Sequence, residues 1–165
     1  VIIGHSERRQ YFGETNESVN NKIKASLRHN LIPIVCVGET LSQRESGETL
    51  KVLDDHIENG LKDITDTDIL NIVIAYEPVW AIGTGKNATP QQAQEAQKYI
   101  RDLLRKMYNN DIADTVRIQY GGSVKPDNIT ELMSQPDIDG ALVGGGSLQI
   151  ETFTEIVKNG ALVKK

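Results

Sequence analysis

The chain has 165 residues, of which 38% are hydrophobic and 25% are charged, a composition typical of one globular domain with a real core. The formal net charge is −5, and the acidic and basic residues are interspersed without the basic stripe that neutralises nucleic-acid phosphates. No apolar stretch reaches the roughly 18 residues of a membrane span. The single cysteine excludes an internal disulfide framework and a cysteine-based zinc cluster. We therefore expect no nucleic acid, no membrane and a cytoplasmic location, while backbone N–H groups could still hold a small anionic substrate.

Short apolar runs alternate with longer amphipathic ones along the chain. The short runs are rich in Val and Ile and apolar on both faces, which is typical of buried parallel strands. They cover residues 1–3, 32–37, 71–76, 116–120 and 140–143. Repeated strand–helix units predict a parallel sheet with right-handed crossovers.

The longest helical pattern covers residues 91–108, and Thr89 and Gln92 supply the two halves of a capping box at its start. Other helical patterns cover residues 17–30, 43–61, 128–134 and 152–158. For the second of these, Ser42 followed by Glu45 offers another capping box.

Polar or glycine-rich residues follow every predicted strand. They are Gly4-His5-Ser6-Glu7, Gly38-Glu39, Glu77-Pro78, Gly121-Gly122-Ser123 and Gly144-Gly145-Gly146-Ser147. In a (β/α)8 barrel the carboxyl ends of the strands form the active-site face, whereas a doubly wound sheet concentrates ligand groups at one switch point. The pattern favours an α/β fold of the barrel kind. Because the sequence begins inside an apolar run, we interpret residues 1–165 as an incomplete barrel with about five of the eight strand–helix units.

Glu77 ends a strand whose preceding residues are apolar. A carboxylate at such a position projects into the mouth of the barrel, where partial desolvation favours its neutral form and raises its pKa. A raised pKa suits a general base that removes a carbon-bound proton. The alternative is a strand-end glutamate that is solvated or paired with a neighbouring lysine.

The segment after Glu77 has the composition of a lid. Its residues are Pro78, Val79, Trp80, Ala81, Ile82, Gly83, Thr84, Gly85 and Lys86. Apolar residues at a loop tip are costly to expose unless the loop closes over something, and the proline and glycine ends would absorb the change in backbone dihedrals. The alternative is a tip packed permanently on a neighbouring helix.

His5 follows the first strand on the same face as Glu77, and Ser6 and Glu7 suit a helix start. The N–H groups of a helix N-terminus would disfavour the imidazolium and keep the ring neutral. A lone histidine is nevertheless more often structural than catalytic.

The remaining histidines and the cysteine are interpreted as structural. His29 and His56 lie on helical stretches and are expected at the surface. Cys36 lies inside an apolar run and is expected in the core, not as a nucleophile.

Two glycine-rich turns follow the last two strands, at residues 121–123 and 144–147. Glycine lets the backbone approach an anion closely, and the N–H groups of such turns are donors. Either turn alone is a weak signal, but the two together predict a phosphate site.

Five segments give the sequence a resemblance to a known family. GHSERR, VCVGE, AYEPVWAIGTGK, IQYGGSV and GALVGGGSL occur in the order and spacing of triosephosphate isomerases, and the likeness runs from Val1 almost to Lys165. The resemblance implies a TIM barrel and an aldose–ketose isomerase of glycolysis and gluconeogenesis. Such an enzyme interconverts dihydroxyacetone phosphate and D-glyceraldehyde 3-phosphate through an enediol(ate) intermediate.

The resemblance also implies roles for the residues. Glu77 would move the proton between the two carbons, and neutral His5 would polarise the carbonyl and move protons between the oxygens of the enediol intermediate. Ser6 and Glu7 would support the site, and the lid would exclude water. Backbone N–H groups would bind the phosphate, and they belong to Gly83, Ser123, Gly144 and Gly145.

The same resemblance implies no metal ion and no organic cofactor, a phosphorylated triose as substrate, and a homodimer in the full-length protein. A complete barrel of this type has roughly 250 residues. In the family the first strand supplies a catalytic lysine with a nearby asparagine, and the third loop makes most of the dimer contact. Neither maps onto this chain, so we expect the fragment alone to be inactive and its dimerisation to be doubtful.

Two alternatives stay open at this stage. The chain could be a non-catalytic phosphate-binding half-barrel that assembles with itself or with a partner. It could also belong to another barrel enzyme that acts on a phosphorylated metabolite, although that reading explains neither GHSERR nor the lid.

Overall fold

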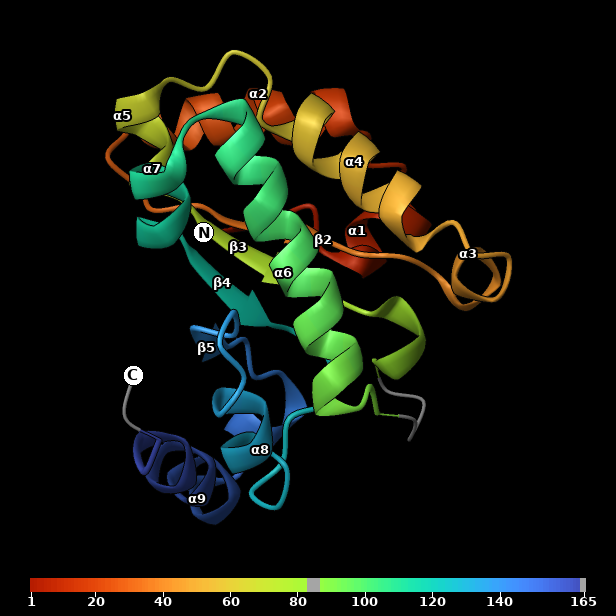
Figure 1. The fold of residues 1–165 in the computed structure, drawn as a ribbon, viewed down its shortest axis with the longest axis vertical. Helices are drawn as coiled ribbons and strands as arrows, with labels where there is room; N and C mark the ends of the chain where they lie inside the picture. Colours follow the sequence, from red (N-terminus) through yellow and green to blue (C-terminus); the bar gives the residue numbers. More distant parts are fainter. Residues whose placement is uncertain (83–86, 164–165) are drawn as a thin grey trace.

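The computed structural model describes residues 1–82 and 87–163, and within them five strands form one parallel sheet (Figure 1). The strands are β1 (Ile2–Ile3), β2 (Ile34–Val37), β3 (Val73–Tyr76), β4 (Arg117–Tyr120) and β5 (Gly140–Ala141). Each strand pairs with the next one along the chain, in the order β1-β2-β3-β4-β5. A doubly wound sheet would reverse this order at its switch point. The sequential order therefore confirms the prediction of an α/β fold that is part of a barrel.

Helices connect the strands and cover the sheet. They are α1 (Ser6–Phe12), α2 (Asn16–Arg28), α3 (Leu41–Glu45), α4 (Thr49–Gly60), α5 (Asp66–Ile69), α6 (Pro90–Met107), α7 (Asn110–Thr115), α8 (Ile129–Met133) and α9 (Ile150–Ala161). Two short 3-10 helices, η1 (Val79–Ala81) and η2 (Gly145–Leu148), lie in the loops after β3 and β5. Successive helices pack side by side, α2 on α4, α4 on α6, α6 on α8 and α8 on α9.

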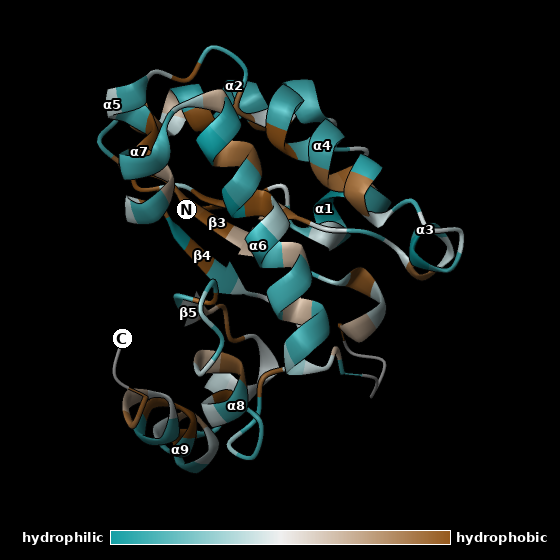
Figure 2. Cartoon of the chain, in the orientation of Figure 1, coloured by the Kyte–Doolittle hydropathy of each residue, from teal (hydrophilic) through white to brown (hydrophobic). Residues whose placement is uncertain are grey.

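The core lies between this helix layer and the strands. All four residues of β3 are buried, and Figure 2 shows this strand as hydrophobic along most of its length. From the helices, Leu53 and Ile57 of α4 and Ile100 and Leu104 of α6 are fully buried. Among the described residues, no helix is both long and apolar enough to cross a membrane.

Helix α6 begins as the sequence predicted. Thr89 accepts from the Gln92 N–H, the Gln92 side chain accepts from the Thr89 N–H, and Pro90 occupies the first turn. The prediction of one helix over residues 43–61 is wrong. The chain turns at Gly47, whose φ of +75° favours glycine, so α3 and α4 are separate.

The capping box before α3 also differs from the prediction. It consists of Thr40 and Gln43 instead of Ser42 and Glu45. Both pairs have the spacing of a capping box, and the chain uses the pair that lies closer to the end of β2.

Candidate active site

Glu77 follows directly after β3, and its side chain is almost entirely buried, with 3% of the residue exposed. Its Oε1 lies 3.1 Å from His5 Nε2, and its Oε2 accepts a hydrogen bond of 3.1 Å from the Ser6 N–H. Burial raises the pKa of the Glu77 carboxyl, which the contacts with His5 and the Ser6 amide only partly oppose. This direction agrees with the expectation from the sequence.

His5 is the N-cap residue of α1, and the hydrogen bonds of its ring define which nitrogen carries the proton. Nδ1 accepts from the Glu7 N–H at 3.3 Å, so this nitrogen has no proton. Nε2 then carries the proton and donates it toward Glu77 Oε1. The ring is a neutral donor that faces a carboxylate of raised pKa.

Ser6 and Glu7 act at the site through their backbones. The Ser6 N–H reaches Glu77, and the Glu7 N–H fixes the ring of His5. The Glu7 side chain itself is exposed. The sequence indicated that both residues support the site, but it could not show that the backbone amides make the contacts.

The glycine-rich turns and the acid–base pair line one cavity of about 480 Å³. Its lining includes His5 and Glu77 together with Ser123, Gly144 and Gly145. In the described part of the chain, the N–H groups of these last three residues donate to no protein acceptor. They are therefore available to an anionic ligand. Gly83, the fourth predicted phosphate-binding residue, lies outside the described residues.

The first two glycines of the turn after β4 leave room for neighbouring side chains. A Cβ on Gly121 would lie 2.9 Å from Cγ of Glu77, and a Cβ on Gly122 would lie 2.3 Å from the Tyr120 hydroxyl. The sequence interpretation assigned these glycines to phosphate binding alone. The structure adds that they allow Glu77 and Tyr120 to occupy their positions.

The described half of the predicted lid is packed, not exposed. Pro78 and Ala81 are buried, and Trp80 is partly buried. The apolar side chains of this half are thus wholly or partly shielded from solvent. The remainder of the lid, Gly83, Thr84, Gly85 and Lys86, lies outside the described residues, so its closure stays a prediction.

Glu39 contacts residues 78–82, a role that was not predicted from the sequence. Its carboxylate is fully buried and accepts hydrogen bonds from Trp80 Nε1 at 2.9 Å and from the Tyr76 hydroxyl at 3.1 Å. Arg44 of α3 donates to the same carboxylate at 3.1 Å, and its guanidinium lies 4.8 Å from the centre of the Trp80 ring. Its signals in the sequence were its position after a strand and its place at the end of the VCVGE segment.

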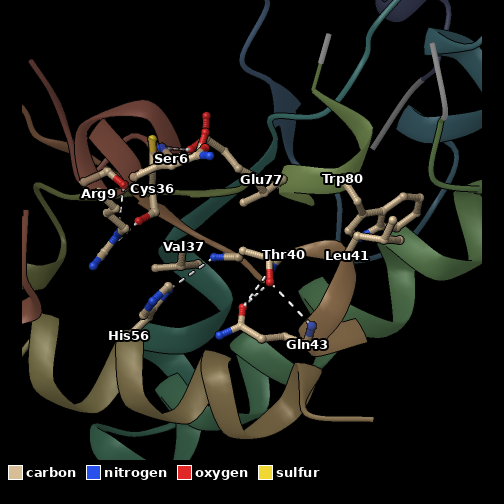
Figure 3. Close-up of a pocket in the computed structure, with 14 residues that line it drawn as sticks. Ser6, Arg9, Cys36, Val37, Thr40, Leu41, Gln43, His56, Glu77 and Trp80 are labelled. Carbon is tan, nitrogen blue, oxygen red and sulfur yellow. Dashed lines mark hydrogen bonds between the residues drawn. The ribbon is translucent and has the colours of Figure 1, made fainter. Parts of the chain in front are cut away.

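Cys36, His29 and His56 were predicted to be structural residues. Cys36 is buried as expected, and burial together with the neighbouring Glu77 raises the pKa of its thiol. His29 is exposed as expected. The prediction for His56 is wrong, because this side chain points into a cavity of about 490 Å³ behind Glu77 (Figure 3).

No cluster of three or more metal-ligating side chains occurs among residues 1–82 and 87–163. The donors at the site include backbone N–H groups and one neutral imidazole, and Lys125 also lines the cavity. This donor set fits an anionic organic substrate.

A parallel sheet in sequence order, with its polar groups at the carboxyl ends of the strands, defines part of a (β/α)8 barrel. The model of the triosephosphate isomerase family matches residues 1–160. The chain belongs to this family.

The chain is similar to triosephosphate isomerases of several bacteria. It is 60% identical over 158 residues to that of Citrifermentans bemidjiense and 61% identical over 158 residues to that of Carboxydothermus hydrogenoformans, in each case over 96% of this chain and 63% of the relative. It is 61% identical over 157 residues to that of Caldanaerobacter subterraneus subsp. tengcongensis, over 95% of this chain and 63% of the relative. The chain thus spans 63% of the length of these relatives.

Proposed function

We propose that the whole protein containing this chain interconverts dihydroxyacetone phosphate and D-glyceraldehyde 3-phosphate. The observation that carries the proposal is the pair formed by Glu77 and His5, a buried carboxylate of raised pKa 3.1 Å from a neutral imidazole donor. A base of raised pKa and a neutral donor are what proton transfer beside a carbonyl requires. Triosephosphate isomerase is itself a standard example of such a pair.

In the proposed reaction, Glu77 removes a proton from the carbon next to the substrate carbonyl. The electrons of the broken C–H bond form the carbon–carbon double bond of the enediolate. The Nε2–H of His5 donates to the carbonyl oxygen as negative charge develops on it. His5 then moves the hydroxyl proton from the oxygen of the first carbon to the former carbonyl oxygen. Glu77 returns its proton to the neighbouring carbon, and the ketose becomes the aldose.

The phosphate of the substrate would lie between the turns after β4 and β5. The N–H groups of Ser123, Gly144 and Gly145 border the cavity and have no protein acceptor within the described residues. A phosphate held there leaves the three-carbon chain next to Glu77 and His5, which line the same cavity. The N–H group of Gly83 would be a further donor to the phosphate. The lid 78–86 would exclude water, which would otherwise promote loss of phosphate from the intermediate.

We assign the catalytic competence to the whole protein and not to residues 1–165 alone, which we interpret as a barrel from the fourth strand onward. The family's lysine and asparagine on its first strand have no counterpart here, and the chain spans 63% of the length of its relatives. The homodimer and the cytoplasmic location are likewise proposed for the whole protein, and no cofactor is required by the scheme.

A coupled isomerase assay, combined with size-exclusion chromatography, tests the proposal. The whole protein should convert both triose phosphates, whereas residues 1–165 alone should bind phosphate weakly and show no turnover. If the whole protein binds phosphate without any turnover, the result would favour the alternative hypothesis that this chain is a non-catalytic phosphate-binding half-barrel.

A further inference from the structure

The turn after β2 supports the backbone that carries Glu77. The Glu77 N–H donates to the Val37 carbonyl at 2.7 Å, and the Val79 N–H donates to the Glu39 carbonyl at 3.0 Å. Between these two bonds, Gly38 lies so close that a Cβ on it would be 1.8 Å from the Glu77 carbonyl oxygen. The position of residues 37–39 therefore determines where the backbone of Glu77 lies.

His56 connects this turn to the helix layer. It projects from α4, and its Nδ1 accepts a hydrogen bond of 3.3 Å from the Gly38 N–H (Figure 3). Within the described residues, this amide donates to no other acceptor. Removing the acceptor would leave a backbone N–H group unpaired beside the reacting carboxylate, and such a group favours rearrangement.

The surroundings of His56 keep its ring in the accepting form. Burial, reinforced by the Arg9 guanidinium, lowers the pKa of His56 to about 4, while Asp55 on its own helix acts in the opposite direction. Cys36 and Glu77 are the other titratable groups that line the same cavity. At neutral pH the ring is therefore neutral, and its contact with the Gly38 N–H places its one proton on Nε2, which leaves Nδ1 as the acceptor.

We propose that His56 is a positioning residue for Glu77, because its Nδ1 fixes the Gly38 turn against which the Glu77 backbone packs. The inference rests on the proposed function, in which Glu77 is the base. Displacing the base should lower kcat more than it weakens substrate binding, because the rate of proton transfer depends steeply on geometry.

Substitutions that keep or remove the acceptor separate positioning from a general structural role. In His56→Asn the side-chain oxygen is attached at the same carbon as Nδ1 of histidine, so it can accept from the Gly38 N–H. His56→Leu fills similar space without an acceptor. Lys51→Gln, at an exposed position on the same helix, is the matched control.

The three variants are measured in the whole protein by coupled isomerase kinetics across pH, under conditions where circular dichroism shows them folded. For His56→Leu we expect kcat to fall about tenfold with KM nearly unchanged. The acid limb of kcat/KM should move to lower pH as water reaches Glu77 and weakens the effect of burial. His56→Asn and Lys51→Gln should retain near-wild-type values.

Three results would overturn the inference. They are a folded His56→Leu protein with wild-type kcat, a folded His56→Asn protein as slow as His56→Leu, and an unmoved acid limb. If His56→Leu does not fold, His56→Gln replaces it, because its acceptor lies one methylene further out and should lower kcat in the same way. If the wild-type protein lacks isomerase activity, only the proposed function fails, and an NMR titration of Glu77 in wild type and variant still decides whether His56 positions it.

Discussion

Substitution of Gly121 by alanine tests how closely the turn after β4 fits Glu77. Gly121 does not have a positive φ, so alanine is compatible with its backbone and the effect is steric. The new Cβ would lie 2.9 Å from Glu77 Cγ and 3.3 Å from the Tyr76 carbonyl oxygen. Ordinary carbon–carbon contacts are about 3.5–4.0 Å, so the Glu77 side chain must move by roughly 0.6–1 Å.

A displacement of this size has a measurable cost in rate. A misplacement of about 1 Å can lower the rate about 100-fold, so we expect kcat of Gly121→Ala to fall about 10- to 100-fold. Overpacking of this kind also costs about 1–3 kcal/mol of the free energy of unfolding. The measurements are steady-state kinetics in the coupled isomerase assay and urea unfolding of the same preparation.

The control for this substitution is Gly60→Ala. Gly60 lies in helix α4, and a Cβ there would meet only Val19 Cγ1 at 3.8 Å, an ordinary van der Waals distance. This variant should keep the wild-type kcat and gain a little stability from the better helix former. A Gly121→Ala protein with the kcat of Gly60→Ala would refute the argument that the glycine is needed to place Glu77.

Three further predictions concern the groups around the base. In His5→Asn the oxygen can still cap the first turn of α1, but the shorter side chain places no donor at the position of Nε2. We therefore expect kcat to fall about 100-fold or more at nearly unchanged KM, and an unchanged kcat would contradict the role of Nε2. Glu39→Gln weakens the contact with Trp80 Nε1, so it should lower the free energy of unfolding by about 1–3 kcal/mol. The fluorescence emission of Trp80, the single tryptophan, should shift to longer wavelength. An unaltered emission would show that Glu39 does not hold the indole ring in place. Because burial lowers the pKa of His56 from 6.5 to about 4, the folded protein binds fewer protons than the unfolded chain between these values. Its free energy of unfolding should therefore decline as pH falls from 6.5 to about 4. Urea titrations at several pH values should show a smaller decline for His56→Asn than for the wild type. An equal decline in the two proteins would contradict the buried, neutral state of His56.

Local patterns were sufficient to predict most of the architecture. Buried parallel strands and amphipathic helices have different periodicities, so the five strands and helix α6 lie close to their predicted ranges. The carboxyl ends of parallel strands share one edge of the sheet. Glu77 and His5 could therefore be expected close together, although they lie far apart in the sequence. Ser6, the residue after His5, is 71 positions from Glu77. The split between α3 and α4 was missed because Ser42 and Glu45 have the spacing of a capping box and suggested a helix start before Gly47, whereas the apolar stripe begins only at Leu50.

The supporting contacts of the site depend on tertiary packing that no local pattern encodes. His56 lies on an amphipathic helix, and nothing in its neighbourhood in the sequence indicates that its ring faces the turn after β2. Glu39 resembles any polar residue after a strand until Tyr76 and Trp80 are seen to donate to it. The need for Gly121 becomes visible only when Glu77 is placed beside it.

The most direct measurement of the central claim is the kcat of Glu77→Asp in the whole protein, determined in the coupled isomerase assay. Aspartate keeps the carboxylate but withdraws it by one methylene from the position 3.1 Å from His5 Nε2. If Glu77 transfers the proton, kcat should fall by orders of magnitude, about 100-fold or more, while the variant stays folded and KM changes little. A folded Glu77→Asp protein with the kcat of the wild type would contradict the assignment of Glu77 as the base.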